Sequence, residues 1–91
     1  MNRRVRLTVL GRVQGVGFRY FVRKRALELG LEGEVRNLPD GTVEVIATGT
    51  NGSLEALIGL VNLGPRGAVV SDVRIEWDAP VQQMPGFRIR D

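Results

Sequence analysis

The sequence predicts one α+β domain, spanning residues 1–91, in which two helices pack on one face of a mostly antiparallel sheet. Several segments alternate apolar and polar residues with a period of two, which is typical of half-buried strands. Two longer segments place apolar residues three or four positions apart, as amphipathic helices do. Glycine and proline separate these segments, and a length of 91 residues suits a single domain.

The first strand is expected within 5–9, where valine and leucine alternate with arginine and threonine. A glycine-rich loop over 11–17 leads into a helix over 18–29. The apolar stripe of this helix consists of Phe18, Val22, Ala26 and Leu29. Gly30 is the expected stop, because glycine accepts the left-handed conformation in which many helices end.

The next two strands, over 35–38 and 42–48, are expected to pair as a hairpin, because Pro39-Asp40-Gly41 between them is a turn signal. A second helix follows, with Asn51 or Ser53 as its expected N-cap. Its buried stripe is predicted to consist of Leu54, Leu57, Ile58 and Val61.

Two further strands are expected after Gly64-Pro65-Arg66-Gly67, which ends the second helix. Apolar residues alternate with charged ones over 73–77, where Trp77 is expected in the core, and 86–90 forms a short last strand. The order is therefore βαββαβ with a short C-terminal strand. The packing that buries each apolar face is the ferredoxin-like two-layer sandwich.

The composition restricts the chemistry that this chain can perform. It has neither cysteine nor histidine, which excludes thiolate nucleophiles, Ser-His-Asp catalysis and the commonest zinc ligands. We expect no metal and no cofactor. The net charge of +3 favours an anionic partner, which is either a small phosphorylated metabolite or a nucleic acid.

No apolar run approaches the ~20 residues that span a bilayer. The N-terminal residues lead into an alternating pattern and show no secretory apolar region. The expectation is a cytoplasmic monomer with no membrane partner.

The loop over 11–17 has the composition of an anion-binding turn. Gly11, Gly15 and Gly17 allow a ligand to approach the backbone closely, and the helix that follows adds partial positive charge at its N-terminus. Arg19 lies in the first helical turn, where a cation is unfavourable unless an anion is bound beside it. By spacing alone, a plain structural turn remains the alternative. The loop lacks the Gly-Lys-Ser/Thr ending of the nucleotide-binding P-loop.

The residues themselves are more specific than their spacing. Gly11-Arg12-Val13-Gln14-Gly15-Val16-Gly17-Phe18-Arg19 closely resembles the signature of the acylphosphatase family. The resemblance continues through Val35-Arg36-Asn37, Asp40-Gly41-Thr42-Val43-Glu44, Gly64-Pro65 and Gly86-Phe87-Arg88-Ile89. It covers essentially the whole chain without a large insertion, and that family has the ferredoxin-like sandwich.

The resemblance implies an enzyme that hydrolyses the carboxyl–phosphate bond of small-molecule acyl phosphates to a carboxylate and inorganic phosphate. It assigns Arg19 as the phosphate-binding arginine and Asn37 as the residue that orients the attacking water. It also implies that the phosphate is held by the backbone amides of Gly15, Val16, Gly17, Phe18 and Arg19.

Several neighbouring residues are expected to have structural roles. Gln14 shapes the loop, Phe18 anchors it in the core, and Asp40 and Gly41 serve the turn. Glu34 stands where the family often has an aromatic residue, and we expect it on the surface.

Two alternatives remain at this point. One is a non-catalytic module that binds phosphate or carbamoyl phosphate, as in the larger carbamoyl-handling hydrogenase maturation factors; a chain that ends at Asp91 without further cysteines favours the separate enzyme. The other is a nucleic-acid-binding sheet, which needs aromatic side chains for base stacking. Of the five aromatic residues, Phe18, Tyr20 and Phe21 cluster around the first helix, so we expect no nucleic-acid partner.

Overall fold

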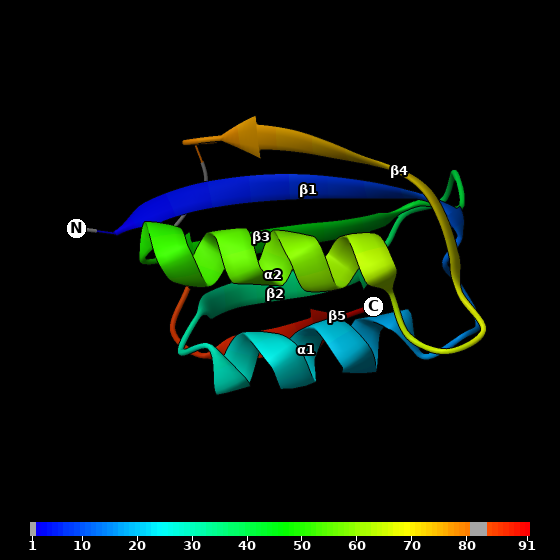
Figure 1. Ribbon diagram of the computed structural model, residues 1–91, viewed down its shortest axis with the longest axis horizontal. Coiled ribbons are helices and arrows are strands. Elements are labelled where there is room, and N and C mark those ends of the chain that lie inside the picture. The colour runs from blue at the N-terminus through cyan, green and yellow to red at the C-terminus, as the bar shows by residue number, and fades with distance from the viewer. Residues whose placement is uncertain (1, 81–83) are drawn as a thin grey trace.

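The computed structural model describes residues 2–80 and 84–91, and its elements follow the predicted order (Figure 1). These elements are β1 (Arg3–Arg12), α1 (Phe18–Glu28), β2 (Glu32–Asn37), β3 (Val43–Gly49), α2 (Asn51–Leu63), β4 (Val69–Trp77) and β5 (Phe87–Arg90). Strands β2 and β4 begin several residues earlier than their apolar patterns indicate.

The strands form one sheet in the order β4-β1-β3-β2-β5. All neighbouring strands are antiparallel except β2 and β5, which are parallel. Both helices lie in front of this sheet in Figure 1. The predicted two-layer ferredoxin-like sandwich with an added C-terminal strand is confirmed.

The core lies between the sheet and the two helices. Val5, Leu7 and Val9 of β1 alternate toward the helices and are fully buried. The helices meet them with buried side chains, which are Phe18, Val22 and Ala26 of α1 and Leu54, Leu57 and Val61 of α2. Burial of each of the larger side chains, the valines, leucines and Phe18, stabilises the fold by about 1.5–3 kcal/mol relative to its exposed state.

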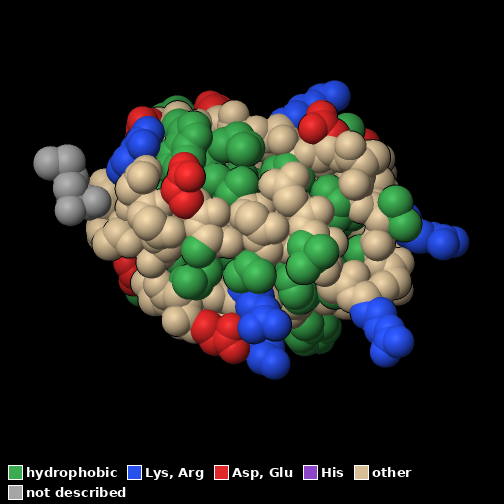
Figure 2. All heavy atoms as spheres, viewed as in Figure 1, with side chains coloured by type: hydrophobic (Ala, Val, Ile, Leu, Met, Phe, Trp, Pro, Cys, Tyr) green, Lys and Arg blue, Asp and Glu red, His purple; other side chains and the backbone are tan. Residues whose placement is uncertain are grey.

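Strand β4 lies at the edge of the sheet, where the helices cover it only in part. Ile75 shares the face of the buried Leu7 but is 44% exposed. Figure 2 shows hydrophobic side chains gathered on this face near the end of β4 and along α2. Trp77, predicted in the core, packs against its margin, and the Arg3 guanidinium lies 4.3 Å from its ring centre.

The N-cap of α2 differs from the prediction. Thr50 has the extended backbone that a cap requires, and its hydroxyl accepts a hydrogen bond from the Ser53 amide at 3.3 Å. Asn51 and Ser53 both lie inside the helix. The helix therefore begins one residue earlier than a cap at Asn51 implies.

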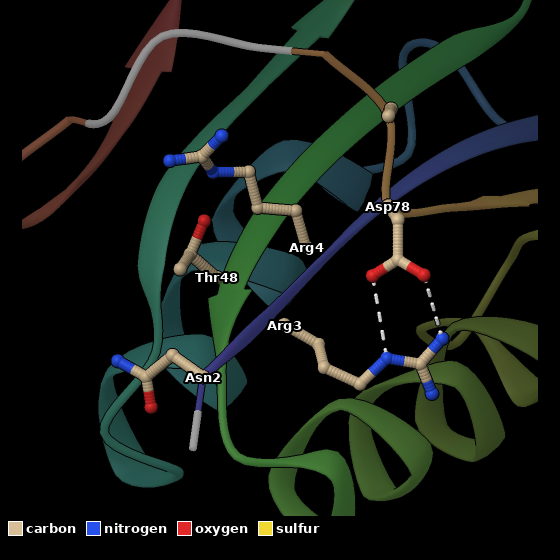
Figure 3. A pocket seen from close by; sticks show the side chains of 6 residues that line it. Asn2, Arg3, Arg4, Thr48 and Asp78 are labelled. Atoms are coloured by element: carbon tan, nitrogen blue, oxygen red, sulfur yellow. Dashed lines mark hydrogen bonds and ion pairs between the residues drawn. The ribbon is translucent and has the colours of Figure 1, made fainter.

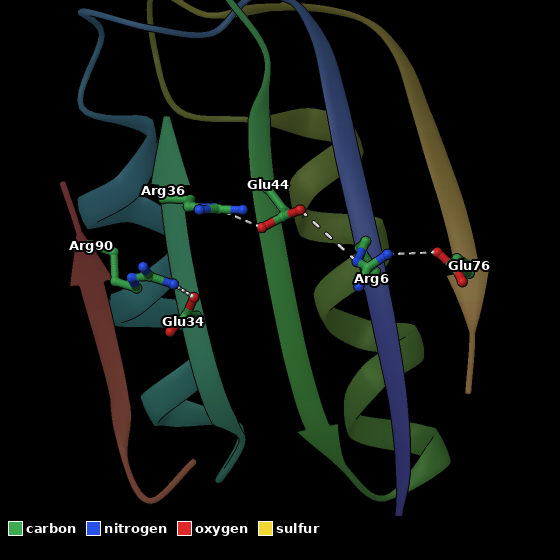
Figure 4. A network of polar contacts seen from close by, with 6 residues as sticks. All are labelled: Arg6, Glu34, Arg36, Glu44, Glu76 and Arg90. Atoms are coloured by element: carbon green, nitrogen blue, oxygen red, sulfur yellow. Dashed lines mark hydrogen bonds and ion pairs between the residues drawn. The ribbon is translucent and has the colours of Figure 1, made fainter. Parts of the chain in front are cut away.

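The surface prediction for Glu34 is wrong, because this residue is only 2% exposed. Strand β5 pairs along β2, and its Arg88 and Arg90 approach the carboxylate from the neighbouring strand. Figure 4 shows Glu34 within a set of charged side chains on the sheet face opposite the helices. A prediction from residue type alone places glutamate at the surface, because glutamate is rarely buried without a partner.

None of the helices within residues 2–80 and 84–91 has the length and apolar character needed to cross a membrane.

Candidate active site

The loop after β1 is held in the core at its start and bends at two glycines. The Val13 side chain is 1% exposed. Gly15 and Gly17 have φ values of 74° and 75°, which glycine adopts at little cost. Gly17 is the N-cap of α1, so the loop turns directly into the helix.

This bend leaves a cluster of backbone donors at the start of α1. Across the described residues, the amides of Gly15 to Tyr20 donate to no protein acceptor. The first turn of α1 carries no acidic side chain that could cap them. Unpaired amides at a helix N-terminus attract an anion, as the sequence predicts for this loop.

Gln14 joins this loop to the turn between β2 and β3. Its side-chain amide donates to the carbonyl oxygens of Leu38 at 2.8 Å and Thr42 at 2.9 Å. Figure 1 shows the loop, this turn and the start of α1 at the same end of the molecule. These bonds agree with the expected role of Gln14 in shaping the loop, and they link the loop to the turn.

Asn37 is the last residue of β2, and the turn begins immediately after it. The Leu38 amide donates to the Thr42 carbonyl at 2.9 Å, which closes the turn. Asp40 accepts hydrogen bonds from the Thr42 hydroxyl and the Thr42 amide, and these bonds lower the pKa of the Asp40 carboxyl. The turn role predicted for Asp40 is confirmed.

Arg19 is the second residue of α1, and its side chain is 29% exposed. Its Nη1 donates to the Arg90 carbonyl at 3.3 Å and lies 3.6 Å from the Asp91 carboxylate. A guanidinium has five N–H groups, so these contacts leave others for an anion at the loop.

These parts surround one small hollow of about 100 Å³. Its lining consists of Val13, Gly15, Gly17, Phe18, Arg19, Tyr20 and Asn37. The structure thus brings Asn37 beside the loop and Arg19, as the resemblance implies, although β3 separates β2 from β1 in the sheet. Val16 does not line the hollow, because its side chain packs against the core.

Tyr20 is the lining residue that sequence reasoning missed. It is 72% exposed and directly follows Arg19 in the first turn of α1. That position was the available signal, since the first turn of a helix borders whatever its N-terminal amides bind.

A larger hollow of about 330 Å³ lies at the opposite end of β1 (Figure 3). Its charges are already paired in part, because Arg3 Nη2 lies 3.0 Å from Asp78 Oδ2 and the hydrogen bond from Arg3 lowers the pKa of Asp78. Arg3 Nη1 also donates to Asn51 at 3.1 Å. A carboxylate in the lining repels an anionic ligand, so the smaller hollow is the better candidate for a phosphate.

The described residues contain no group of three or more Asp, Glu, His or Cys side chains placed to hold a metal ion.

Known proteins resemble this chain in sequence and in fold. The acylphosphatase family profile matches residues 5–89. A protein named acylphosphatase from Thermococcus kodakarensis is 46% identical over 94% of this chain and 93% of its own length. The solved structure of an acylphosphatase from Coxiella burnetii superposes with a TM-score of 0.92 at 43% identity, covering 98% of this chain and 93% of that one.

The chain also superposes on part of a larger protein. Full-length HypF, solved in a phosphate- and nucleotide-bound form, matches with a TM-score of 0.92 at 27% identity. The match covers 100% of this chain but 12% of HypF. Because the family profile matches nearly the whole sequence and the Thermococcus relative matches over 93% of its own length, this chain belongs to the acylphosphatase family.

Proposed function

We propose that the hollow between the loop and Asn37 is where this chain hydrolyses acyl phosphates. The phosphate is held by the amides of residues 15–19 and by the Arg19 guanidinium, and Asn37 orients the attacking water. One observation carries this assignment: the unpaired amides, Arg19 and Asn37 meet at a single hollow. The relatives named acylphosphatase support the activity.

The residues present are sufficient for this reaction because the leaving group is good. The water oxygen bonds to phosphorus, and the bond from phosphorus to the acyl oxygen breaks. The carboxylate departs with the electron pair, and its conjugate acid has a pKa of roughly 4 to 5, so it needs little help from a general acid. Such transfers have loose transition states, in which catalysis depends on positioning and charge stabilisation.

Each part of the hollow has a separate role in that step. The amides and Arg19 stabilise the negative charge on the equatorial phosphate oxygens. The Asn37 side chain accepts a hydrogen bond from water through its carbonyl oxygen and cannot act as a strong base. The water proton therefore passes to a phosphate oxygen of the substrate or to solvent.

The size of the hollow supports recognition of the phosphate end of the substrate. A volume of about 100 Å³ suits a phosphate group and leaves the acyl group outside. Acetyl, carbamoyl and glyceroyl phosphates share that end. We therefore expect this chain to hydrolyse several acyl phosphates. Their rate constants should depend more on the acidity of the carboxylic acid that leaves than on contacts between the protein and the acyl group.

The test is phosphate release from benzoyl phosphate and acetyl phosphate with EDTA present. Arg19→Ala and Asn37→Ala are each expected to lose about 10²–10³-fold in kcat/KM. Arg74→Ala and Asn62→Ala are matched controls, since Arg74 is exposed on β4 and Asn62 donates to the Ile58 carbonyl within α2. Wild-type activity in Arg19→Ala contradicts the proposed site.

The second candidate is a module that binds a phosphate compound without turning it over, since the chain also superposes on a part of HypF, which was solved in a phosphate- and nucleotide-bound form. Calorimetry with inorganic phosphate separates the two. Phosphate binding that depends on Arg19, with no phosphate release from either acyl phosphate, supports the binding module and excludes the enzyme.

A further inference from the structure

Strand β5 is a short edge strand that α1 holds by two arginines. Arg23 Nε donates to the Phe87 carbonyl at 3.0 Å, and Arg19 Nη1 donates to the Arg90 carbonyl at 3.3 Å. Arg19 and Arg23 are four residues apart, so they lie on the same face of the helix. The position of β5 therefore determines the position of the Arg90 carbonyl, which accepts the hydrogen bond from Arg19.

A buried carboxylate holds the same strand from the other face of the sheet. The Glu34 side chain on β2 is 3% exposed, and its Oε2 accepts a hydrogen bond from Arg90 Nη1 at 2.7 Å (Figure 4). This hydrogen bond raises the pKa of the Arg90 guanidinium. Glu34 Oε1 lies 3.7 Å from Arg88 Nη2 and accepts no hydrogen bond from the described residues.

Arg90 thus connects Glu34 to Arg19 through two different groups. Its side chain binds Glu34 on one face of the sheet, and its carbonyl accepts from Arg19 on the helix side. Only the carboxylate of this pair is buried, since the Arg90 side chain is 46% exposed. A buried carboxylate without its partner is strongly unfavourable, so the pair fixes the position of Arg90 relative to Glu34.

We propose that Glu34 is a positioning residue for Arg19, which acts by fixing β5 and thereby the Arg90 carbonyl. This inference rests on the phosphate-binding role proposed for Arg19. With Nη1 held by the carbonyl, the guanidinium has a fixed position before the substrate arrives, and Arg19 lines the hollow. Loss of the Glu34 contact lets β5 shift, and the Arg19 guanidinium then has no fixed position when the substrate binds.

The test compares Glu34→Gln with Glu76→Gln. Glu34→Gln keeps the side-chain volume and one acceptor but removes the charge. We expect kcat/KM to fall about tenfold and the inhibition constant of inorganic phosphate to rise by a similar factor. Glu76 accepts from Arg6 at 3.1 Å at the far edge of the same sheet face, so Glu76→Gln is expected to stay within twofold of wild type on both quantities.

A spectroscopic measurement separates positioning of Arg19 from a general loss of stability. The heteronuclear NOE of the Arg19 Nε–Hε group is expected to fall in Glu34→Gln and to stay unchanged in Glu76→Gln. Arg90→Gln keeps the backbone carbonyl of residue 90 but loses the ion pair with Glu34, so it should lower kcat/KM and the Arg19 NOE as Glu34→Gln does. The double variant should have the same kcat/KM as either single variant, because both changes remove one contact.

Two outcomes overturn the inference. One is Glu34→Gln within twofold of wild type in kcat/KM and phosphate inhibition; the other is a lower rate with an unchanged Arg19 signal. Arg19→Ala, assayed in parallel, shows which proposal has failed. If Arg19→Ala is inactive while Glu34→Gln is unchanged, only the role of Glu34 is wrong; full activity in Arg19→Ala contradicts the proposed site itself.

Discussion

Replacing Gln14 by leucine removes both hydrogen bonds that join the phosphate loop to the turn after Asn37. Neither acceptor is left alone, because the Leu38 carbonyl still accepts from the Gly41 amide at 3.1 Å and the Thr42 carbonyl from the Leu38 amide at 2.9 Å. The variant therefore loses the link between the two segments without creating an unpaired buried acceptor.

The magnitude follows from these two bonds. A net contribution of about 0.5–1.5 kcal/mol each gives a loss of about 1–3 kcal/mol, and the retained partners favour the lower half, about 1.5 kcal/mol. For a domain of this size, that loss lowers Tm by roughly 6–12 °C. Because Asn37 and the loop are no longer held at one distance, kcat should fall about 10–100-fold.

Phosphate release from acetyl phosphate and urea denaturation measure the two effects separately. Phosphate inhibition should change less than threefold in Gln14→Leu, because it requires the loop and Arg19 but not Asn37. At pH 7, Gln14→Glu should lower both kcat and the free energy of unfolding more than Gln14→Leu does. A carboxylate cannot donate a hydrogen bond and would face two carbonyl oxygens. Asn62→Leu, which loses one side-chain bond to a carbonyl in α2, is the control. A kcat within twofold of wild type in Gln14→Leu would refute this reasoning.

Three further predictions concern single turns and caps, each measured by urea denaturation. Gly17→Ala should lower the free energy of unfolding by about 1 kcal/mol because of the positive φ at this position, and Gly17→Asn should lower it less. Gly11→Ala should lower it by about 2–3 kcal/mol, because the added methyl group would clash with the Val69 carbonyl. Equal losses at the two positions would contradict this difference in backbone environment. Hydrogen bonds from Thr42 lower the pKa of Asp40 in the folded state, so its contribution is present above about pH 4 and is lost as pH falls through the folded pKa. Asp40→Asn should therefore flatten the stability profile between about pH 5 and pH 2, and an unchanged profile would exclude this role. Thr50→Ala should destabilise α2 by about 0.5–1 kcal/mol, with recovery in Thr50→Ser but not in Thr50→Val.

Local patterns were sufficient to predict the elements and the layers. The alternation of Val5, Leu7 and Val9 identifies a buried strand face wherever the strand lies in the sheet. The glycines that bend the loop were equally visible, because a positive φ depends on the residue and its immediate neighbours.

Contacts between distant segments were not accessible in the same way. The proximity of Asn37 to the loop depends on the order β1-β3-β2, and only the resemblance to a known family implied it. The bonds of Gln14 to the turn also depend on that order. The last strand was predicted, but its parallel pairing with β2 was not, and this pairing is what buries Glu34.

If the unpaired amides of Gly15 to Tyr20 bind an anion as proposed, the stability of this protein should depend on the anions in solution. An ion that binds the folded chain but not the unfolded chain shifts the unfolding equilibrium by mass action, by about 2.7 kcal/mol at 100 times its Kd. Inorganic phosphate, the product, occupies the same cradle as the substrate in the proposed mechanism. A phosphate buffer should therefore raise Tm and reduce the measured rate together, and both effects should disappear in Arg19→Ala.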